Sequence, residues 1–555
     1  MMMLRRLARV REHHGPPPVG GGRGGDVRVC GATRRSFLAA STLAAGFVYP
    51  LRKITGKGTA ASYCGREILT VRPVEDTTST FSNPDMGWTI YETYPVDQSP
   101  HGSSTLLTCP GENFPGVDYA AVMFSWFDIE KTEGVYDFTK ADFAYDYWRK
   151  RGKRMQLHMS TESWLWWNQR NPPAGKGPPD YVVDKLPPHE REMRVSAGIP
   201  YVELDARNEF YRKSVAAFLR AVAKHFSGER AVELVDLRGF GVWGEWHNGY
   251  IFNNLAEIPL EAKYPLLEKR REDLKGIIDI WSEAFPHNYL ALSFSYDPDG
   301  PTDYYAGPVD KFDLAYTKHY AGYIRFSAFD YAMTKPNVTL RRDGCGGAIH
   351  SNERLFNKRV FNTLAKGPMM SEFFGGYRES LKAYGEQHVR WMVEDALSIH
   401  PNYVALMGWQ SKDALAFLKE QPELIRRGMT RMGYRLVPTE VTYPALVRAG
   451  GKIPIGMRWV NRASGRAMRD YHLHVRLATK SGRPVSEVDV GQLPTSRWIA
   501  GREYALQREF PVDGVRPGVY ALQAALRDAK SARAINLAIV GFQGGWFPVG
   551  KVRII

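Results

Sequence analysis

Two glutamates have the surroundings that general acid–base chemistry requires. Glu245 lies in the segment 241–249 (GVWGEWHNG), and Glu372 lies in the segment 367–377 (GPMMSEFFGGY). Apolar and aromatic neighbours raise the pKa of a carboxyl group until it can act as an acid near neutral pH, and glycines let a ligand approach the backbone. In the alternative interpretation, each glutamate only satisfies backbone donors or an arginine such as Arg342. We expect catalysis at both positions.

Polar and aromatic residues near these glutamates are candidates for ligand binding. Aromatic rings stack on flat ligands, and several Trp side chains in one irregular segment are rarely all buried. The alternatives are a core aromatic for Trp409 and a structural ion pair for Arg342. No metal-binding motif or cofactor-binding motif appears, so we expect neither a metal nor a cofactor. The predicted ligand-binding residues are Trp166, Trp167, Trp243, His247, Asn248, Arg342, Asp343, Tyr377 and Trp409.

Alternating strand and helix patterns must position these side chains. Short apolar runs predict strands, and apolar residues at three- and four-residue spacing predict helices, most clearly over 209–226. About eight strands separated mostly by helices indicate an α/β fold, a (β/α)8 barrel. An open doubly wound sheet is less favoured because no Gly-rich phosphate turn follows an early strand. The expected strands are 86–91, 118–130, 154–160, 232–247, 289–295, 337–343, 367–373 and 403–410.

The carboxyl ends of these strands are the expected position of the active site. Active residues of such barrels lie at the carboxyl ends of the strands. Glu245 comes near the end of the fourth expected strand, and Glu372 comes near the end of the seventh. His158 ends the third, where a core histidine is the more common outcome. A barrel would therefore bring the two glutamates to one face.

The pattern changes after residue 433. Apolar and polar residues alternate over 453–459, 471–477 and 520–526, with Gly, Pro and Ser between the runs and no helical pattern. This alternation predicts strands with one buried face. We expect a barrel domain over 62–433 and an immunoglobulin-like β-sandwich over 434–555, which supports the barrel or binds glycan weakly.

The N-terminal segment has the composition of an export signal. Residues 33–38 (TRRSFL) resemble the twin-arginine pattern, and the apolar stretch 37–51 that follows has the length of a signal-peptide core. We therefore assign 1–61 to a twin-arginine signal peptide with a disordered extension, and we expect a periplasmic or extracellular protein. In that compartment Cys64, Cys109 and Cys345 allow at most one disulfide.

Charge and hydropathy exclude several classes of protein. The formal net charge is +15, but residues 1–60 hold 11 Lys and Arg against two acids, so the rest of the chain is only mildly basic. With no basic run and no nucleic-acid-binding motif in that remainder, we expect no nucleic-acid partner. Apart from the signal segment, no apolar run is long enough to span a bilayer.

One motif resembles a known group of enzymes. The stretch 124–138 (FSWFDIEKTEGVYDF) is similar to the second-strand signature of family 42 β-galactosidases and related retaining glycosidases, with Lys131 where those enzymes have proline. Over most of 75–555 the chain looks more like the glycosidase-like domain-of-unknown-function family 4832. The resemblance implies a (β/α)8 barrel with an acid/base on strand four and a nucleophile on strand seven. Glu130 of the motif is expected to be structural.

The resemblance leads to a specific hypothesis. It implies an exported glycoside hydrolase that acts on an oligosaccharide or polysaccharide, with Glu245 as acid/base and Glu372 as nucleophile. The related enzymes have Asn immediately before the acid/base, whereas this chain has Gly244. Either His247 or Asn248 replaces that Asn, or Glu245 is not a standard acid/base. The alternatives are a non-catalytic glycan-binding or envelope protein and, less favoured, a carbohydrate lyase or epimerase.

Overall fold

The computed structural model describes most of the chain after the N-terminal segment. The predicted signal segment lies outside the described residues. The described ranges are 67–90, 116–161, 177–196, 199–204, 207–230, 232–240, 244, 246, 260–294, 328–346, 366–373, 375–406, 411–542 and 544–555.

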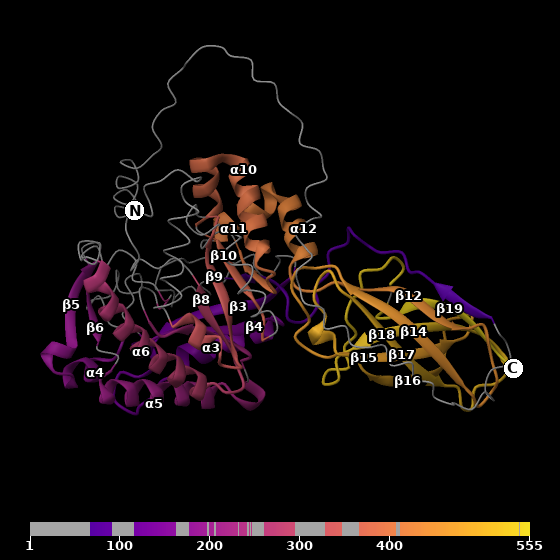
Figure 1. The fold of residues 1–555 in the computed structure, drawn as a ribbon, viewed down its shortest axis with the longest axis horizontal. Coiled ribbons are helices and arrows are strands. Elements are labelled where there is room, and N and C mark those ends of the chain that lie inside the picture. Colours follow the sequence, from indigo (N-terminus) through magenta and orange to yellow (C-terminus); the bar gives the residue numbers. More distant parts are fainter. Residues whose placement is uncertain are drawn as a thin grey trace, which may run out of the picture. The chain divides into compact units, whose positions relative to one another are not determined.

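Parallel strands close into a barrel, as predicted (Figure 1). Each strand pairs with the next in the chain, and the last pairs with the first, through Tyr403↔Gly87 and Val404↔Trp88. The predicted (β/α)8 barrel is therefore confirmed. In barrel order the strands are β2 (Gly87–Ile90), β3 (Val117–Ser125), β4 (Arg154–Ser160), β7 (Leu234–Arg238), β8 (Tyr289–Phe294), β9 (Val338–Cys345), β10 (Met370–Phe373) and β11 (Tyr403–Ala405).

Side chains alternate between the two faces of these strands. Tyr119, Leu234 and Met370 pack together in a small buried cluster. Val122 and Phe124 of β3 belong instead to a large second cluster that includes residues of the surrounding helices. Because successive residues of a strand point to opposite faces, the first cluster fills the barrel interior and the second lies between strands and helices.

Helices follow most of the barrel strands. In α5 the expected apolar face is buried, and Asn208 caps the helix by accepting a hydrogen bond from the Tyr211 amide at 2.9 Å. The last helical segment after the barrel strands consists of two helices, because Pro422 begins a new helix at its first position. The helices are α2 (Trp126–Ile129), α3 (Thr139–Lys150), α4 (Asp180–Lys185), α5 (Glu209–His225), α6 (Leu260–Ala284), α8 (Phe329–Ala332), α10 (Tyr377–Ser398), α11 (Ser411–Glu420) and α12 (Pro422–Arg431).

Two strands end earlier than their apolar runs predict. β3 stops at Ser125, which begins α2 with a capping box: its hydroxyl accepts from the Asp128 amide, and the Asp128 carboxylate accepts from the Ser125 amide. β7 stops at Arg238. It is followed by Gly239, where a Cβ atom would lie 2.6 Å from Ile277 and from Trp281 of α6. Helix α6 thus packs directly against the backbone at this point.

The C-terminal sheets form the predicted sandwich around their own core. One strand comes from before the barrel: β1 (Ile68–Val71), in a range assigned by sequence to the barrel, pairs antiparallel with β12. A further hairpin of β5 (Arg191–Ser196) and β6 (Ile199–Leu204) was not expected from the sequence. The sandwich strands are β12 (Leu436–Pro444), β13 (Leu446–Val447), β14 (Lys452–Asn461), β15 (His472–Ala478), β16 (Pro484–Gln492), β17 (Glu503–Pro511), β18 (Gly518–Arg527) and β19 (Phe547–Ile554).

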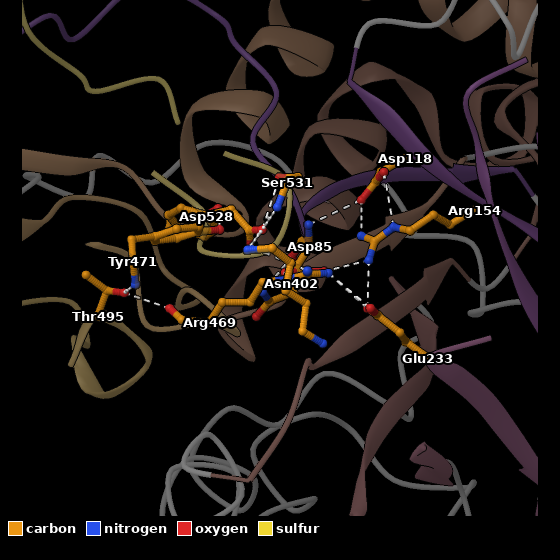
Figure 2. A network of polar contacts seen from close by, with 12 residues as sticks. Asp85, Asp118, Arg154, Glu233, Asn402, Arg469, Tyr471, Thr495, Asp528 and Ser531 are labelled. Atoms are coloured by element: carbon orange, nitrogen blue, oxygen red, sulfur yellow. Dashed lines mark hydrogen bonds and ion pairs between the residues drawn. The ribbon is translucent and has the colours of Figure 1, made fainter. Parts of the chain in front are cut away.

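An ion-pair network joins barrel residues to sandwich residues (Figure 2). Arg154, at the start of β4, contacts Asp85 at 2.7 Å and Glu233 at 2.8 Å, and it also pairs with Asp118. Arg469, just before β15, contacts Asp85 at 2.9 Å and Glu233 at 3.0 Å. The two arginines share two carboxylates, so the amino ends of the barrel strands and the sandwich are linked by charge.

In the parts of the chain that the structure describes, no helix combines the length and the apolar character needed to cross a bilayer.

Candidate active site

Polar side chains occupy the barrel interior toward the carboxyl ends of the strands. Glu372 follows Met370 by two residues on β10, so it points to the same, inner face. By the same alternation, Asp236 and Arg238 follow Leu234 on β7. Arg341 belongs to this set through its contacts, described below. All four ionisable side chains are buried, where a charge is costly unless an opposite charge lies near it.

The Glu372 carboxylate is paired with an arginine. Its Oε2 atom contacts Nη2 of Arg341, and only 4% of the residue is exposed. Arg341 also donates from Nη1 to the hydroxyl of Ser293 on β8 at 3.3 Å. Both arginine contacts come from rigid strands, which limits the positions that the guanidinium can take.

Asp236 lies at the centre of the charged residues. Its Oδ2 atom accepts a hydrogen bond from Nε of Arg238 at 2.8 Å. Nδ1 of His158 lies 3.5 Å from the same oxygen, and Nε of Arg341 lies 3.6 Å from it. One carboxylate oxygen therefore faces groups from three strands, β4, β7 and β9. We call His158, Asp236, Arg238, Arg341 and Glu372 the inner polar cluster.

His158 is the uncharged member of the inner polar cluster. Complete burial, together with the positive charges of Arg238 and Arg341, holds the pKa of its imidazole well below the usual value. The ring is thus neutral near pH 7. This agrees with the expectation of a core histidine at the end of this strand. The remaining members are two arginines and two carboxyl groups.

The surroundings of Glu245 are described although Glu245 itself is not. Trp246, which follows it, is 7% exposed, and its indole donates to the carbonyl of Leu237 on β7 at 2.6 Å. Gly244, which precedes it, has φ +72°, and a Cβ atom there would lie 2.6 Å from the Cβ of Arg238. Both neighbours of position 245 therefore contact the end of β7, although the strand itself stops at Arg238.

The same geometry explains why glycine occupies position 244. A side chain there would collide with Arg238, and the positive φ favours glycine. Asn has no room at this position.

Some predicted ligand-binding residues lie away from the barrel interior. Arg342 contacts both carboxylate oxygens of Asp395 on α10 at 2.9 Å, which is the geometry of a structural ion pair between β9 and the helix layer. Tyr377 is buried at the start of α10, where its hydroxyl donates to Glu420 at 3.0 Å. The backbone of Asp343 lies in β9, but its side chain is outside the described residues. Trp166, Trp167, Trp243, His247, Asn248 and Trp409 also lie outside them.

Comparisons with known proteins show a distant likeness of fold. No family model matches the chain, and no curated protein matches it. Membership of the glycosidase-like family named above therefore stays a prediction.

Several solved structures match at low sequence identity. The catalytic domain of a β-amylase from Paenibacillus polymyxa is 11% identical, with a TM-score of 0.41, over 61% of this chain and 98% of that one. Endo-glycoceramidase II from Rhodococcus sp. is 12% identical, with a TM-score of 0.34, over 78% and 99% of the two chains. An endogalactoceramidase is 11% identical, with a TM-score of 0.35, over 80% and 100%.

Three members of the inner polar cluster were missed from the sequence. Asp236 and Arg238 occur at i and i+2 in an apolar run, which places both on one face of a strand. Two ionisable residues on one face of a buried strand predict a polar cluster in the interior, because buried charges are rarely unpaired. Arg341 has no such signal, since Arg342 beside it is equally buried on the other face. Within the described ranges, no three His, Cys, Asp or Glu side chains gather as metal ligands would.

Proposed function

We propose that the protein is an exported glycoside hydrolase that cleaves O-glycosidic bonds of an oligosaccharide or polysaccharide with two carboxylates. The observation that supports this most directly is the position of Glu372. It is the inward-facing acid at the carboxyl end of the seventh barrel strand, beside Arg341. The resemblance of residues 124–138 to glycosidases points to the same role.

In the proposed mechanism the two glutamates act in turn. Glu245 protonates the leaving oxygen while Glu372 attacks the anomeric carbon, and Glu245 then activates the water that hydrolyses the intermediate. A nucleophilic carboxylate must be ionised, and an adjacent guanidinium favours that form. A retaining reaction needs the two carboxyl groups about 5–5.5 Å apart, whereas about 6.5–9.5 Å would mean inversion.

We further propose that the sugar is held by residues around the carboxyl ends of the strands. Trp243, His247 and Asn248 flank Glu245, and Trp409 follows the last barrel strand in the sequence. Trp and Tyr rings stack on sugar faces, and His and Asn side chains hydrogen-bond hydroxyl groups. Gly244 cannot carry the side chain that related enzymes use, so His247 and Asn248 are the proposed replacements.

Hydrolysis can be tested by screening the purified protein against nitrophenyl glycosides and polysaccharides. On a substrate that is cleaved, Glu372→Ala should lose turnover even with a good leaving group, because the nucleophile is missing. Glu245→Ala should lose about 10²–10⁴-fold on poor leaving groups but retain its first step on good ones. Azide should rescue Glu245→Ala and give a glycosyl azide of retained configuration.

A buried glutamate outside the site is the matched control. Glu130→Gln should lower stability without this dependence on the leaving group, because the Glu130 carboxylate bonds to Trp126 and Gly134 and interacts with Tyr181 of α4. If both alanine variants keep near wild-type rates, the two-carboxylate assignment is wrong. Glycan binding without turnover by the wild type would instead support a non-catalytic binding protein, in which Arg341 permanently neutralises Glu372.

Export is a separate proposal that rests on the sequence. Replacing Arg34 and Arg35 with Lys should leave the precursor in the cytoplasm, because the twin-arginine pathway requires both arginines. Fractionation and immunoblotting of cells that express each form will measure this. Unchanged secretion of the Lys variant would contradict the assignment.

A further inference from the structure

We propose that Asp236 is a positioning residue that holds Arg341 against Glu372 and balances its charge. This inference rests on the proposed role of Glu372 as nucleophile. Asp236 was not among the predicted site residues, and it acts on the proposed nucleophile only through the arginine.

The geometry places Arg341 between three acceptors on separate strands. Its Nε lies 3.6 Å from Oδ2 of Asp236 on β7, its Nη1 donates to Ser293 on β8, and its Nη2 contacts Glu372 on β10. Arg341 itself comes from β9, between β8 and β10 in the barrel. A guanidinium has donors in a fixed planar arrangement, so contacts on several sides determine its orientation.

The charges of the inner polar cluster balance only when Asp236 is included. The cluster contains two arginines, Arg238 and Arg341, and two carboxyl groups, Asp236 and Glu372, while His158 is neutral. Burial makes an unbalanced charge costly. Without Asp236, Arg341 would lose one of its carboxylate contacts, and Glu372 would face it with one negative charge fewer nearby. Its carboxylate would then be held more tightly and would be a weaker nucleophile.

Among the described residues, polar groups near Arg341 and its partner Asp236 come from three other strands. They are His158 on β4, Asp236 and Arg238 on β7, and Ser293 on β8. The two carboxyl groups, Asp236 and Glu372, contact different nitrogens of Arg341, Nε and Nη2. Removing a negative charge from this set should therefore favour the ionised form of the Glu372 carboxyl group. Removing a positive charge should disfavour that form.

The test compares the pH dependence of kcat/KM between the wild type and two variants. The acidic limb of that dependence reports the ionisation of the nucleophile in the free enzyme. Asp236→Asn keeps the acceptor oxygen and removes one negative charge, so the acidic limb should move to lower pH, with a reduced kcat. Arg341→Gln removes one positive charge, so the limb should move to higher pH. Each shift should be about one pH unit, the lower end of what a neighbouring charge produces.

Asp395→Asn is the matched control. Asp395 is also buried and also paired with an arginine of β9, but that arginine is Arg342, which faces α10. This variant should lose stability and leave the acidic limb unmoved. Shifts of the same sign in Asp236→Asn and Arg341→Gln, or shifts no larger than that of Asp395→Asn, would overturn the proposal.

A second measurement does not depend on activity. Urea unfolding midpoints of Arg341→Gln, Glu372→Gln and the double variant should be non-additive, and this coupling should change when Asp236→Asn is added. Coupling that is absent, or identical in both backgrounds, would also overturn the proposal. A wild type with no hydrolase activity but with this coupling would instead refute the proposed function and leave Asp236 positioning Arg341.

Discussion

At the scale of single residues, the barrel interior is dominated by a few buried charges. Asp236 and Arg341 are each at most 1% exposed, although both side chains are ionisable. Such groups are destabilising unless they are paired and hydrogen-bonded. Their presence near the carboxyl ends of the strands therefore fits a functional requirement for a preorganised polar site better than a requirement for stability.

The lowered pKa of His158 predicts how the free energy of unfolding depends on pH. Its pKa in the folded protein lies well below the usual 6.5, so the unfolded chain binds a proton that the folded protein does not. The free energy of unfolding should therefore fall as pH drops below about 6.5, by up to about 1.4 kcal/mol per pH unit from this group.

The variant His158→Gln should remove this contribution. Urea unfolding of the wild type and of the variant will be measured at about pH 7.5 and about pH 5.5. The variant should lose less stability than the wild type between these pH values. An equal or steeper loss in the variant would show that His158 is protonated in the folded state.

At the scale of elements, the turn after β3 shows what the glycosidase-like motif does in this chain. The Glu130 carboxylate accepts from the Trp126 indole at 2.7 Å and from the Gly134 amide at 2.7 Å. The residues of the motif W-x-x-x-E-x-x-x-G are thus joined by one buried carboxylate. This agrees with the structural role expected of Glu130, and it positions the chain that leads from the second barrel strand into α3.

Removing that carboxylate should destabilise the turn. Glu130→Ala leaves the Trp126 and Gly134 donors without their acceptor, at a cost of about 3 kcal/mol. Glu130→Gln keeps one acceptor oxygen and should lose less. Chemical unfolding of the two variants will test the order, and equal losses would mean that the cavity rather than the hydrogen bonds sets the cost.

At the scale of the whole molecule, the sandwich is tied to the barrel by both chain and charge. β1 belongs to the sandwich although it precedes the barrel in sequence, so the chain passes from sandwich to barrel and back. Arg469 then reaches Asp85 and Glu233, and Asn402 donates to the carbonyls of Asp85 and Arg466 at 2.8 Å. These contacts give the sandwich a supporting role for the amino ends of the strands, away from the inner polar cluster.

The ion-pair network between barrel and sandwich predicts that Arg469 contributes to the stability of both. Arg469→Met leaves the buried Asp85 with one cation fewer and should lower the free energy of unfolding by about 2 kcal/mol, less than for a fully buried pair because Arg469 is 30% exposed. Arg458→Met is the control: Arg458 pairs with Glu503 within the sandwich and is 53% exposed, so it should cost less than about 1 kcal/mol. Equal losses in urea unfolding would show that the network adds no coupling.

The sequence alone determined the periodicities and therefore the class of fold. Strand and helix patterns follow from side-chain spacing along the chain, which is a local property. They predicted β4 to the residue, and they predicted the barrel and the sandwich. They overestimated the length of β7, because its end depends on the close approach of α6 to Gly239, a contact between distant segments.

Tertiary structure alone decided which charges meet. Arg341 and Arg342 are adjacent and equally buried, and sequence favoured Arg342 as a ligand-binding residue. Closure of the barrel turns Arg341 inward to Asp236 and Glu372 and turns Arg342 outward to Asp395. Because both faces of a parallel barrel strand are buried, hydropathy cannot distinguish the inner face from the outer one. Contacts between strands that are far apart in the sequence make that choice.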